Sequence, residues 1–294
     1  MKDRDYTMES LYNIIGYSRQ GISQYMDRGN KRAEVESRVL EQARKWREEL
    51  PGFSARTLYY SIKNQGEEIE VGINKFEKII SKAGLNVQKA PTRIPKTSDG
   101  KGKGSYENLI NGLIINDINQ LIVGDITYYI VGEKTYYIFS LKDVYSQRIL
   151  GLVPSERLFA KHAFECLEQA IQLRGQDKLK SAIHHSDNGS QYEWKRYISK
   201  LDELGMKISR AQNCLQNGSA EQLNDIIKNR FLMPWGVTNL EELRKACDKL
   251  KYHNNELRSI KQLGNMSPNQ FESMIKNIDI DQRIKLRMHD FTTN

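Results

Sequence analysis

The hydrophobic pattern predicts a helical first part of the chain and a mixed α/β second part. Up to residue 85, apolar side chains recur at helical spacing, with helices expected at 8–28 (two short ones), 33–48, 55–63 and 72–80. Beyond residue 106, β-rich runs are expected at 121–130, 135–144, 148–154, 181–185 and 207–210, and helices at 160–173, 194–204, 219–231 and 239–258. Three successive strands, followed by strands that alternate with helices, predict a five-stranded mixed sheet covered by helices.

Turn and capping residues divide the helical part into small modules. Gly16 can close the first helix and Ser18 can cap the second, which outlines either a helix-turn-helix or an ordinary helical hairpin. Pro51 and Gly52 break the next helix, and Gly84 follows the last one. The chain before residue 88 is therefore expected to be all α.

A basic segment at 89–105 separates the two parts. It is rich in proline and glycine, which cannot hold a helix at this density, and its only acidic side chain is Asp99. Its basic side chains include Arg93, Lys96, Lys101 and Lys103. We expect a linker, which serves either as a plain spacer or as a contact along a nucleic-acid backbone.

Composition shows an excess of positive charge and indicates the cellular compartment. The 294 residues carry 45 Lys plus Arg against 37 Asp plus Glu, a net charge of +8, which favours a polyanionic partner and nucleic acid before membrane. The three cysteines form no Cys-x-x-Cys pair, so neither a disulfide framework nor a zinc knuckle is indicated. No apolar run approaches the ~20 residues of a membrane span. We therefore expect a soluble, intracellular protein.

Three carboxylates are the candidates for chemistry. Asp125 interrupts an apolar β-type run, Asp187 follows a short strand and precedes the turn Asn188-Gly189, and Glu221 lies at the start of a helical pattern. Carboxylates on separate elements can converge on two divalent metals roughly 4 Å apart, which stabilise the attacking and leaving oxygens of phosphoryl transfer. Plainer interpretations are a hydrogen-bonded structural aspartate, a strand-ending turn and a solvated helix face.

The helix expected to carry Glu221 has two further signals. Ser219 and Gln222 form a capping-box pattern, which would place Glu221 in the first turn. Lys228 follows two helical turns after Glu221 and is expected on the same face, where it could contact a DNA phosphate.

Several ordered motifs resemble the integrase subunit (OrfB type) of bacterial insertion-sequence transposases, the DDE family related to retroviral integrases. The resemblance covers nearly the whole chain and rests on the segments 125–128, 141–146, 185–192 and 209–214, on Asn217, Ala220, Glu221 and Lys228, and on the segments 252–256 and 267–268. This chain departs from the family at Ile122, where Trp is usual, and at Gln222 and Leu223, where two Phe are usual. The interval between Asp187 and Glu221 is also two residues shorter.

The resemblance implies a domain order. A helix-turn-helix-like segment is expected at 1–32, a helical DNA-binding module at 33–88 with a candidate DNA-facing helix at 73–83, and the basic linker at 89–105. An α/β ribonuclease H-like DDE catalytic core is expected at 106–235 and a C-terminal helical region at 236–294. Alternatively, the helix at 73–83 serves only to pack the module.

The resemblance also implies an activity and partners. Asp125, Asp187 and Glu221 would hold Mg²⁺, with Mn²⁺ as a substitute, for strand cleavage and strand transfer of an insertion sequence. The partners would be transposon ends and target DNA, further copies of the chain on paired ends, and an upstream-frame helix-turn-helix partner or fusion. Lys228, Arg93, Lys96, Lys101 and Lys103 would contact DNA in a cytoplasmic, nucleoid-associated protein.

Two other functions remain open from the sequence. One is a domesticated or inactive DNA-binding protein, and the other is a simple metal-dependent nuclease of the same fold. The three intact acids argue against the first, and the N-terminal helical modules argue against the second.

Overall fold

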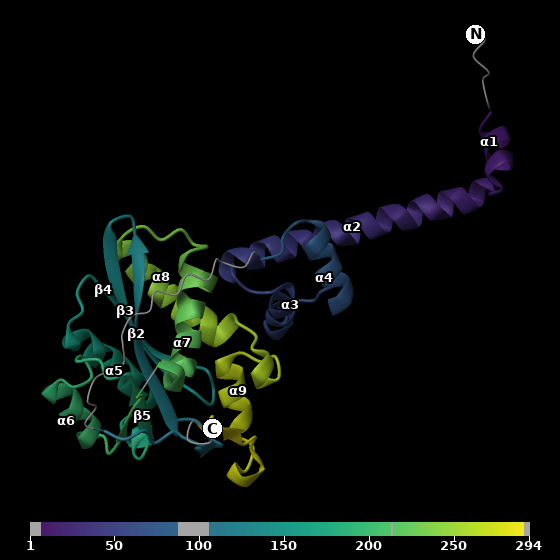
Figure 1. Ribbon diagram of the computed structural model, residues 1–294. Helices are drawn as coiled ribbons and strands as arrows, with labels where there is room; N and C mark the ends of the chain where they lie inside the picture. The colour runs from purple at the N-terminus through teal and green to yellow at the C-terminus, as the bar shows by residue number, and fades with distance from the viewer. Residues whose placement is uncertain (1–6, 88–105, 213, 291–294) are drawn as a thin grey trace.

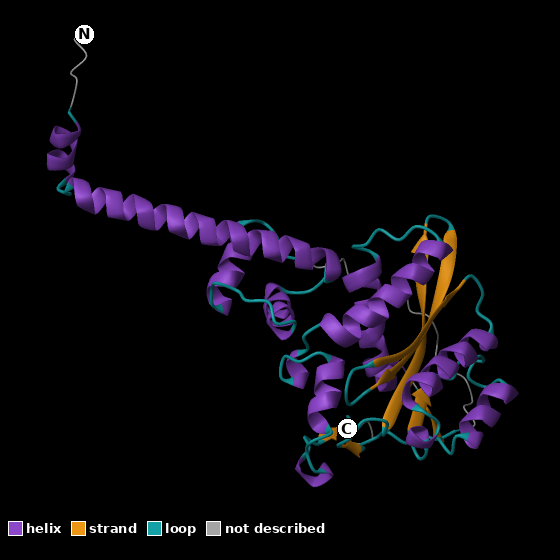
Figure 2. Ribbon diagram, turned by 180° about the vertical axis from the view of Figure 1, so that it is seen from behind, coloured by secondary structure: helices purple, strands orange, loops and turns teal. Residues whose placement is uncertain are grey.

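A helical module and a mixed α/β body follow one another in the computed structural model, which describes residues 7–87, 106–212 and 214–290 (Figure 1). The module consists of α1 (Met8–Ile15), α2 (Arg19–Glu49), α3 (Ala55–Asn64) and α4 (Ile73–Lys82). The expected helices at 55–63 and 72–80 are confirmed within a few residues. Figure 2 shows that α1 and the first half of α2 extend away from the rest of the molecule.

The expected break between a second short helix and a third one is wrong. The caps are as predicted, because Gly16 ends α1 at a φ of 71° and the Ser18 side chain accepts from the Gly21 N–H. However, α2 continues for 31 residues to Glu49, because no proline interrupts residues 27–32. The weak helix formers Asp27, Gly29 and Asn30 do not end the helix. The boundary that we placed between residues 32 and 33 therefore falls inside α2.

The extended arm has no hydrophobic core of its own among the residues that the structure describes. Helix α1 has no buried residue, and the first buried residue of α2 is Val39. A helix-turn-helix needs apolar contacts between its helices, so residues 8–28 alone do not form one. Their role in DNA binding stays a prediction.

The described residues of the α/β body form a five-stranded mixed sheet. Its strands are β2 (Leu121–Val131), β3 (Lys134–Asp143), β4 (Ile149–Ser155), β5 (Ile183–Ser186) and β6 (Lys207–Arg210). Their spatial order is β4-β3-β2-β5-β6. The first three strands pair antiparallel, whereas β5 and β6 join parallel to β2. This confirms the predicted ribonuclease H-like α/β fold.

Helices cover both faces of this sheet, because alternate strand residues point to opposite sides. Ile122 belongs to the core that α5 (Ala160–Arg174) and α6 (Lys195–Glu203) cover. Val123 belongs to the opposite core, which includes Ala220 of α7 (Gly218–Asp225). Helix α8 (Leu240–Tyr252) packs against β4. Asp125 has the parity of Val123 and therefore lies on the α7 face.

Two of the expected helices change geometry near their ends. Helix α7 passes into a π-helical segment, Ile226–Leu232, and α8 passes into another, His253–Leu257. The predicted capping box at Ser219 and Gln222 is wrong. A 3₁₀ turn, Cys214–Asn217, runs directly into α7, so Asn217 is the N-cap without a side-chain cap and Ser219 lies inside the helix.

The helical module packs onto these π-helical segments. The Gly52 N–H donates to the Arg230 carbonyl at 3.0 Å, and the rings of Phe53 and Phe231 are 5.0 Å apart. The chain just after the second π-helical segment also contacts the module, because the Ser259 N–H donates to Ser61 Oγ of α3 at 2.9 Å. The module and the α/β body therefore share one hydrophobic core.

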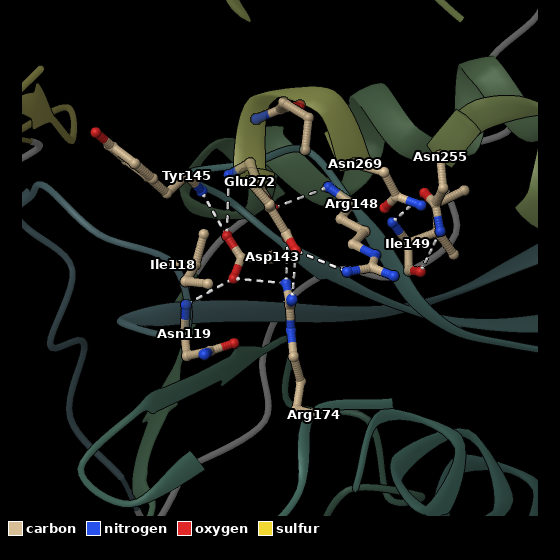
Figure 3. Close-up of polar contacts among 12 residues, drawn as sticks. Ile118, Asn119, Asp143, Tyr145, Arg148, Ile149, Arg174, Asn255, Asn269 and Glu272 are labelled. Carbon is tan, nitrogen blue, oxygen red and sulfur yellow. Dashed lines mark hydrogen bonds and ion pairs between the residues drawn. The ribbon is translucent and has the colours of Figure 1, made fainter. Parts of the chain in front are cut away.

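A buried charge network ties the C-terminal region to the sheet (Figure 3). Glu272 of α9 (Pro268–Ile275) accepts from Arg174 of α5 at 2.5 Å and from Arg148 at 2.7 Å. Arg174 also bonds Asp143, at the end of β3, at 3.3 Å. Further along, β7 (Leu286–Arg287) pairs with β1 (Ile114–Ile115), a contact that was not predicted. Among the helices described, none is both long enough and apolar enough to cross a membrane.

The close approach at Gly52 generates a stability prediction. A Cβ there would collide with the Arg230 backbone, so Gly52→Ala should separate α2 from the first π-helical segment. We expect a loss of roughly 1–3 kcal/mol in the free energy of unfolding, as for other overpacking substitutions. Urea denaturation measures this, with Gly29→Ala as the control because a Cβ at Gly29 meets open space. Equal midpoints for Gly52→Ala and wild type would contradict the packing described.

Candidate active site

Strand register brings the first two predicted acids together. In the parallel pair of β2 with β5, Val123 is the partner of His185. Asp125 and Asp187 each follow two residues later, on the same side of their strands. The two carboxylates therefore project side by side from neighbouring strands onto the face that α7 covers.

The Asp125 carboxyl is held in a partly buried position. Its Oδ2 accepts a hydrogen bond from Asn224 Nδ2 of α7 at 2.7 Å. Burial raises the pKa of Asp125 to about 7, and the Asp187 charge and, more weakly, the Glu221 charge add to this increase. A carboxyl with such a pKa carries its charge at a cost that a nearby cation would remove.

Asp187 is fixed by the turn that follows it. Its Oδ1 accepts from the Gly189 N–H at 3.0 Å, and a Cβ at residue 189 would lie 2.9 Å from the same oxygen. The glycine of the Asn188-Gly189 turn thus lets the backbone approach the carboxylate. Burial raises the pKa of Asp187, while the Gly189 N–H and the Arg210 charge act in the opposite direction.

Glu221 lies on the α7 face that crosses β2. Asn217 and Asn224 are one helical turn before and after it, and they donate to the Gly124 carbonyl at 3.5 Å and to Asp125 at 2.7 Å. Glu221 itself is exposed. Within residues 7–87, 106–212 and 214–290, no three His, Cys, Asp or Glu side chains are gathered closely enough to hold a metal ion. The structure thus brings Asp125 and Asp187 together and leaves the Glu221 carboxylate beside them, turned to solvent.

Lys228 lies near the acids, but not because of the α-helical spacing from Glu221 that we predicted. It belongs to the π-helical segment, so the simple α-helical spacing from Glu221 does not apply. Burial lowers the pKa of Lys228, and the charges of Asp125 and Asp225 counteract this. Its ammonium is therefore within electrostatic reach of Asp125.

Two polar neighbours of the acids, His185 and Asn224, were not among the candidate site residues. His185 is fully buried between Ser209 Oγ, at 2.8 Å from Nδ1, and the Gln216 carbonyl, at 3.2 Å from Nε2. Burial lowers its pKa to about 4, so it is a neutral structural residue. Asn224, which bonds Asp125, was missed, although its spacing of three residues from Glu221 was a usable signal. Arg93, Lys96, Lys101 and Lys103 lie outside the described residues.

The raised pKa of Asp125 predicts a pH-dependent stability. In the metal-free folded protein this carboxyl ionises near pH 7, but in the unfolded chain it ionises near its ordinary value. The folded state therefore binds an extra proton between about pH 4 and 7, and the free energy of unfolding falls as pH rises through that window. We expect Asp125→Asn to remove this fall and to stabilise the metal-free protein at pH 8 by about 1–4 kcal/mol.

Urea denaturation in EDTA at several pH values provides the measurement. Asp202→Asn, on α6, is the matched control because Asp202 is an exposed acid. If the curves of wild type and Asp125→Asn run parallel from pH 4 to 8, the Asp125 carboxyl is not strained in the folded state.

Comparisons with known proteins found matches to the part of the chain that carries Asp125 and Asp187. Residues 116–213 match the integrase core domain family. The putative transposase of insertion element IS986/IS6110 from Mycobacterium tuberculosis is 29% identical over 139 residues, which cover 45% of this chain and 49% of that protein. The IS600 31 kDa protein from Shigella sonnei is 33% identical over 134 residues, covering 45% and 48%. The chain thus spans about half the length of the curated relatives it matches.

A solved structure was also found. The HTLV-2 integrase catalytic core domain in complex with magnesium is 20% identical, with a TM-score of 0.43, and the match covers 56% of this chain and 99% of that one. The sequence matches thus show a similarity that is limited to part of the chain. Residues 116–213 resemble the integrase core domain family, and about 45% of the chain resembles proteins of bacterial insertion sequences, among them putative transposases.

Proposed function

We propose that this chain is the catalytic subunit of a DNA transposase, which cuts and rejoins the strands of an insertion sequence by a DDE mechanism. The observation that carries the proposal is the proximity of Asp125, inside β2, to Asp187, directly after the neighbouring strand β5, under the helix that bears Glu221. The relatives named as transposases support the same conclusion.

The donor set fits a hard divalent cation. Asp125 and Asp187 offer carboxylate oxygens, which Mg²⁺ and Mn²⁺ prefer. The raised pKa of Asp125 means that its negative charge is unfavourable in the folded protein, and a bound cation would neutralise that charge. Glu221 would complete the set after a rotation of its exposed side chain. When bound, Mg²⁺, or Mn²⁺ in its place, would stabilise charge on the attacking and leaving oxygens of the phosphoryl transfer.

The protein residues orient and shield this site. Asn224 fixes the Asp125 carboxyl from α7, and Gly189 fixes the Asp187 carboxyl from the turn. Lys228 supplies a half-buried ammonium close to Asp125, where a scissile phosphate would lie. Positioning and charge neutralisation of this kind are the main sources of catalysis in phosphoryl transfer.

The proposed partners follow from the same function. Transposon ends and target DNA would contact Lys228 and the linker residues Arg93, Lys96, Lys101 and Lys103, in line with the net charge of +8. Two ends need to be held together, so we propose that further copies of the chain assemble on them. An upstream-frame helix-turn-helix partner or fusion is also proposed. An inactive DNA-binding protein and a simple nuclease are the alternatives.

Replacing the three acids tests the proposed chemistry. Asp125→Asn, Asp187→Asn and Glu221→Gln should each reduce cleavage on the order of 100-fold or more, because each removes a charge from the site. The measurement is cleavage and strand transfer of labelled DNA carrying the element's own ends in Mg²⁺, with circular dichroism to verify the fold and Asp202→Asn as the control. Normal cleavage by a variant would remove that acid from the site. Cleavage without strand transfer in wild type would favour a nuclease.

The position of Lys228 generates a second test. Lys228→Ala should weaken the contact with the transposon end and reduce cleavage roughly tenfold at limiting DNA, with partial recovery at high DNA concentration. Lys228→Arg should keep part of the activity because the charge remains. Lys245→Ala serves as the control, since Lys245 lies exposed on α8. A change in the Mg²⁺ titration alone would show that Lys228 supports the carboxylates and does not contact DNA.

A further inference from the structure

A lysine lies buried in the sheet directly beneath the helix that carries Glu221. Lys142 of β3 is 1% exposed, and its Nζ donates to the Ser219 carbonyl of α7 at 2.7 Å and to Gln147 Oε1 at 3.1 Å. Neither partner is a carboxylate. Burying an amine without an ion pair has a free-energy cost, and an apolar side chain is the ordinary choice at a covered position in a strand.

The chemistry of the amine fits these two acceptors. Burial, reinforced by the nearby Arg258 charge, lowers the pKa of Lys142 to about 7. The neutral amine has two N–H donors, which match the two acceptors. A full positive charge next to the first turn of a helix would be unfavourable. The Lys142 side chain therefore connects β3 to α7 through a hydrogen bond.

This connection joins the strand side of the candidate active site, which carries Asp125, to the helix side, which carries Glu221. On the sheet side, Lys142 is paired with Val123, two residues from Asp125 on the same face of β2. On the helix side, its acceptor Ser219 lies two residues before Glu221. The hydrogen bond from Lys142 to Ser219 thus fixes the distance between the first turn of α7 and the sheet beside Asp125.

The other polar links between α7 and the sheet do not duplicate this contact. Asn217 reaches the Gly124 carbonyl at a long 3.5 Å, and Asn224 bonds the Asp125 carboxyl itself, one turn beyond Glu221. Both links go to β2. Lys142 links the same helix to β3, so it restrains the rotation of the turn that bears Glu221.

We propose that Lys142 is a positioning residue, which sets the first turn of α7 and thereby the Glu221 carboxylate against Asp125. The inference rests on the proposed function, because it gives Glu221 a place in the metal site. Displacing a ligand by about 1 Å can cost up to ~100-fold in rate, so the effect on cleavage should be measurable even though Lys142 does not contact DNA.

The test replaces the amine with an apolar side chain of similar length. Lys142→Met should keep the fold and the affinity for DNA, reduce cleavage roughly tenfold at saturating DNA, and raise the Mg²⁺ concentration for half-maximal cleavage several-fold. Lys251→Met is the matched control. Lys251 is a half-buried lysine on α8 whose Nζ donates to Gln169 Oε1 at 3.2 Å, so its replacement should leave both quantities unchanged.

A double-mutant cycle separates positioning from a general structural effect. Mn²⁺ affinity, measured by calorimetry, should fall in Lys142→Met but should not fall further when Lys142→Met is added to Glu221→Gln. Should Lys142→Met fail to fold, Lys142→Gln undergoes the same comparison with the same expected outcomes. Additive losses of Mn²⁺ affinity, or wild-type cleavage with an unchanged Mg²⁺ requirement, would overturn the inference.

The outcome for Asp125→Asn distinguishes the two proposals. If Asp125→Asn is inactive while Lys142→Met behaves like wild type, only the role of Lys142 fails. If Asp125→Asn cleaves normally, the proposed function fails, whatever Lys142→Met does.

Discussion

Asp125 and Asp187 extend from neighbouring parallel strands, and the register of β2 with β5 holds their partly buried carboxylates close together. Burial is the main reason why the pKa of Asp125 rises to about 7, and repulsion from the Asp187 charge adds to the rise. Folding alone gains nothing from this arrangement. The free energy of folding comes from the apolar cores on either side of the sheet, which hold β2 and β5 in place. A divalent cation would convert the repulsion into binding energy, so the strain is consistent with a metal-dependent activity.

The surrounding architecture fixes the helix that faces these acids. Helix α7 is tied to the sheet through Asn217, Asn224 and Lys142. Its π-helical continuation is in turn packed against the N-terminal helical module, where Gly52 and Phe53 meet Arg230 and Phe231. The module that we expected to serve DNA binding therefore packs against the continuation of the helix that bears Glu221. The packed segment and Glu221 belong to one continuous helical stretch, which runs from Gly218 to Leu232.

The sequence predicted those parts that local patterns determine. The hairpin of β2 and β3, the later strands and the helices between them were visible from alternation, helical spacing and glycine positions. Asp125 was recognisable because it interrupts such a pattern, Asp187 because it follows a strand, and Glu221 because it begins a helical pattern at a position that the family resemblance marks. The continuity of α2, the π-helical segments and the contact of Gly52 with Arg230 depend on packing between distant residues, which no local pattern records. For the same reason Lys142 reads as an ordinary strand residue, and its contact with Ser219 appears only in the folded chain.

Calorimetric titration of Mn²⁺ at pH 6, in two buffers with different protonation enthalpies, tests the central claim most directly. If the paired carboxylates bind the cation, Asp125 must lose its proton when the metal enters, so binding should release about one proton per chain. The apparent enthalpy should then differ between the buffers for wild type and be independent of the buffer for Asp125→Asn, with weaker binding in that variant. Mn²⁺ binding without proton release, or equal binding by wild type and Asp125→Asn, would contradict a metal site at Asp125 and Asp187.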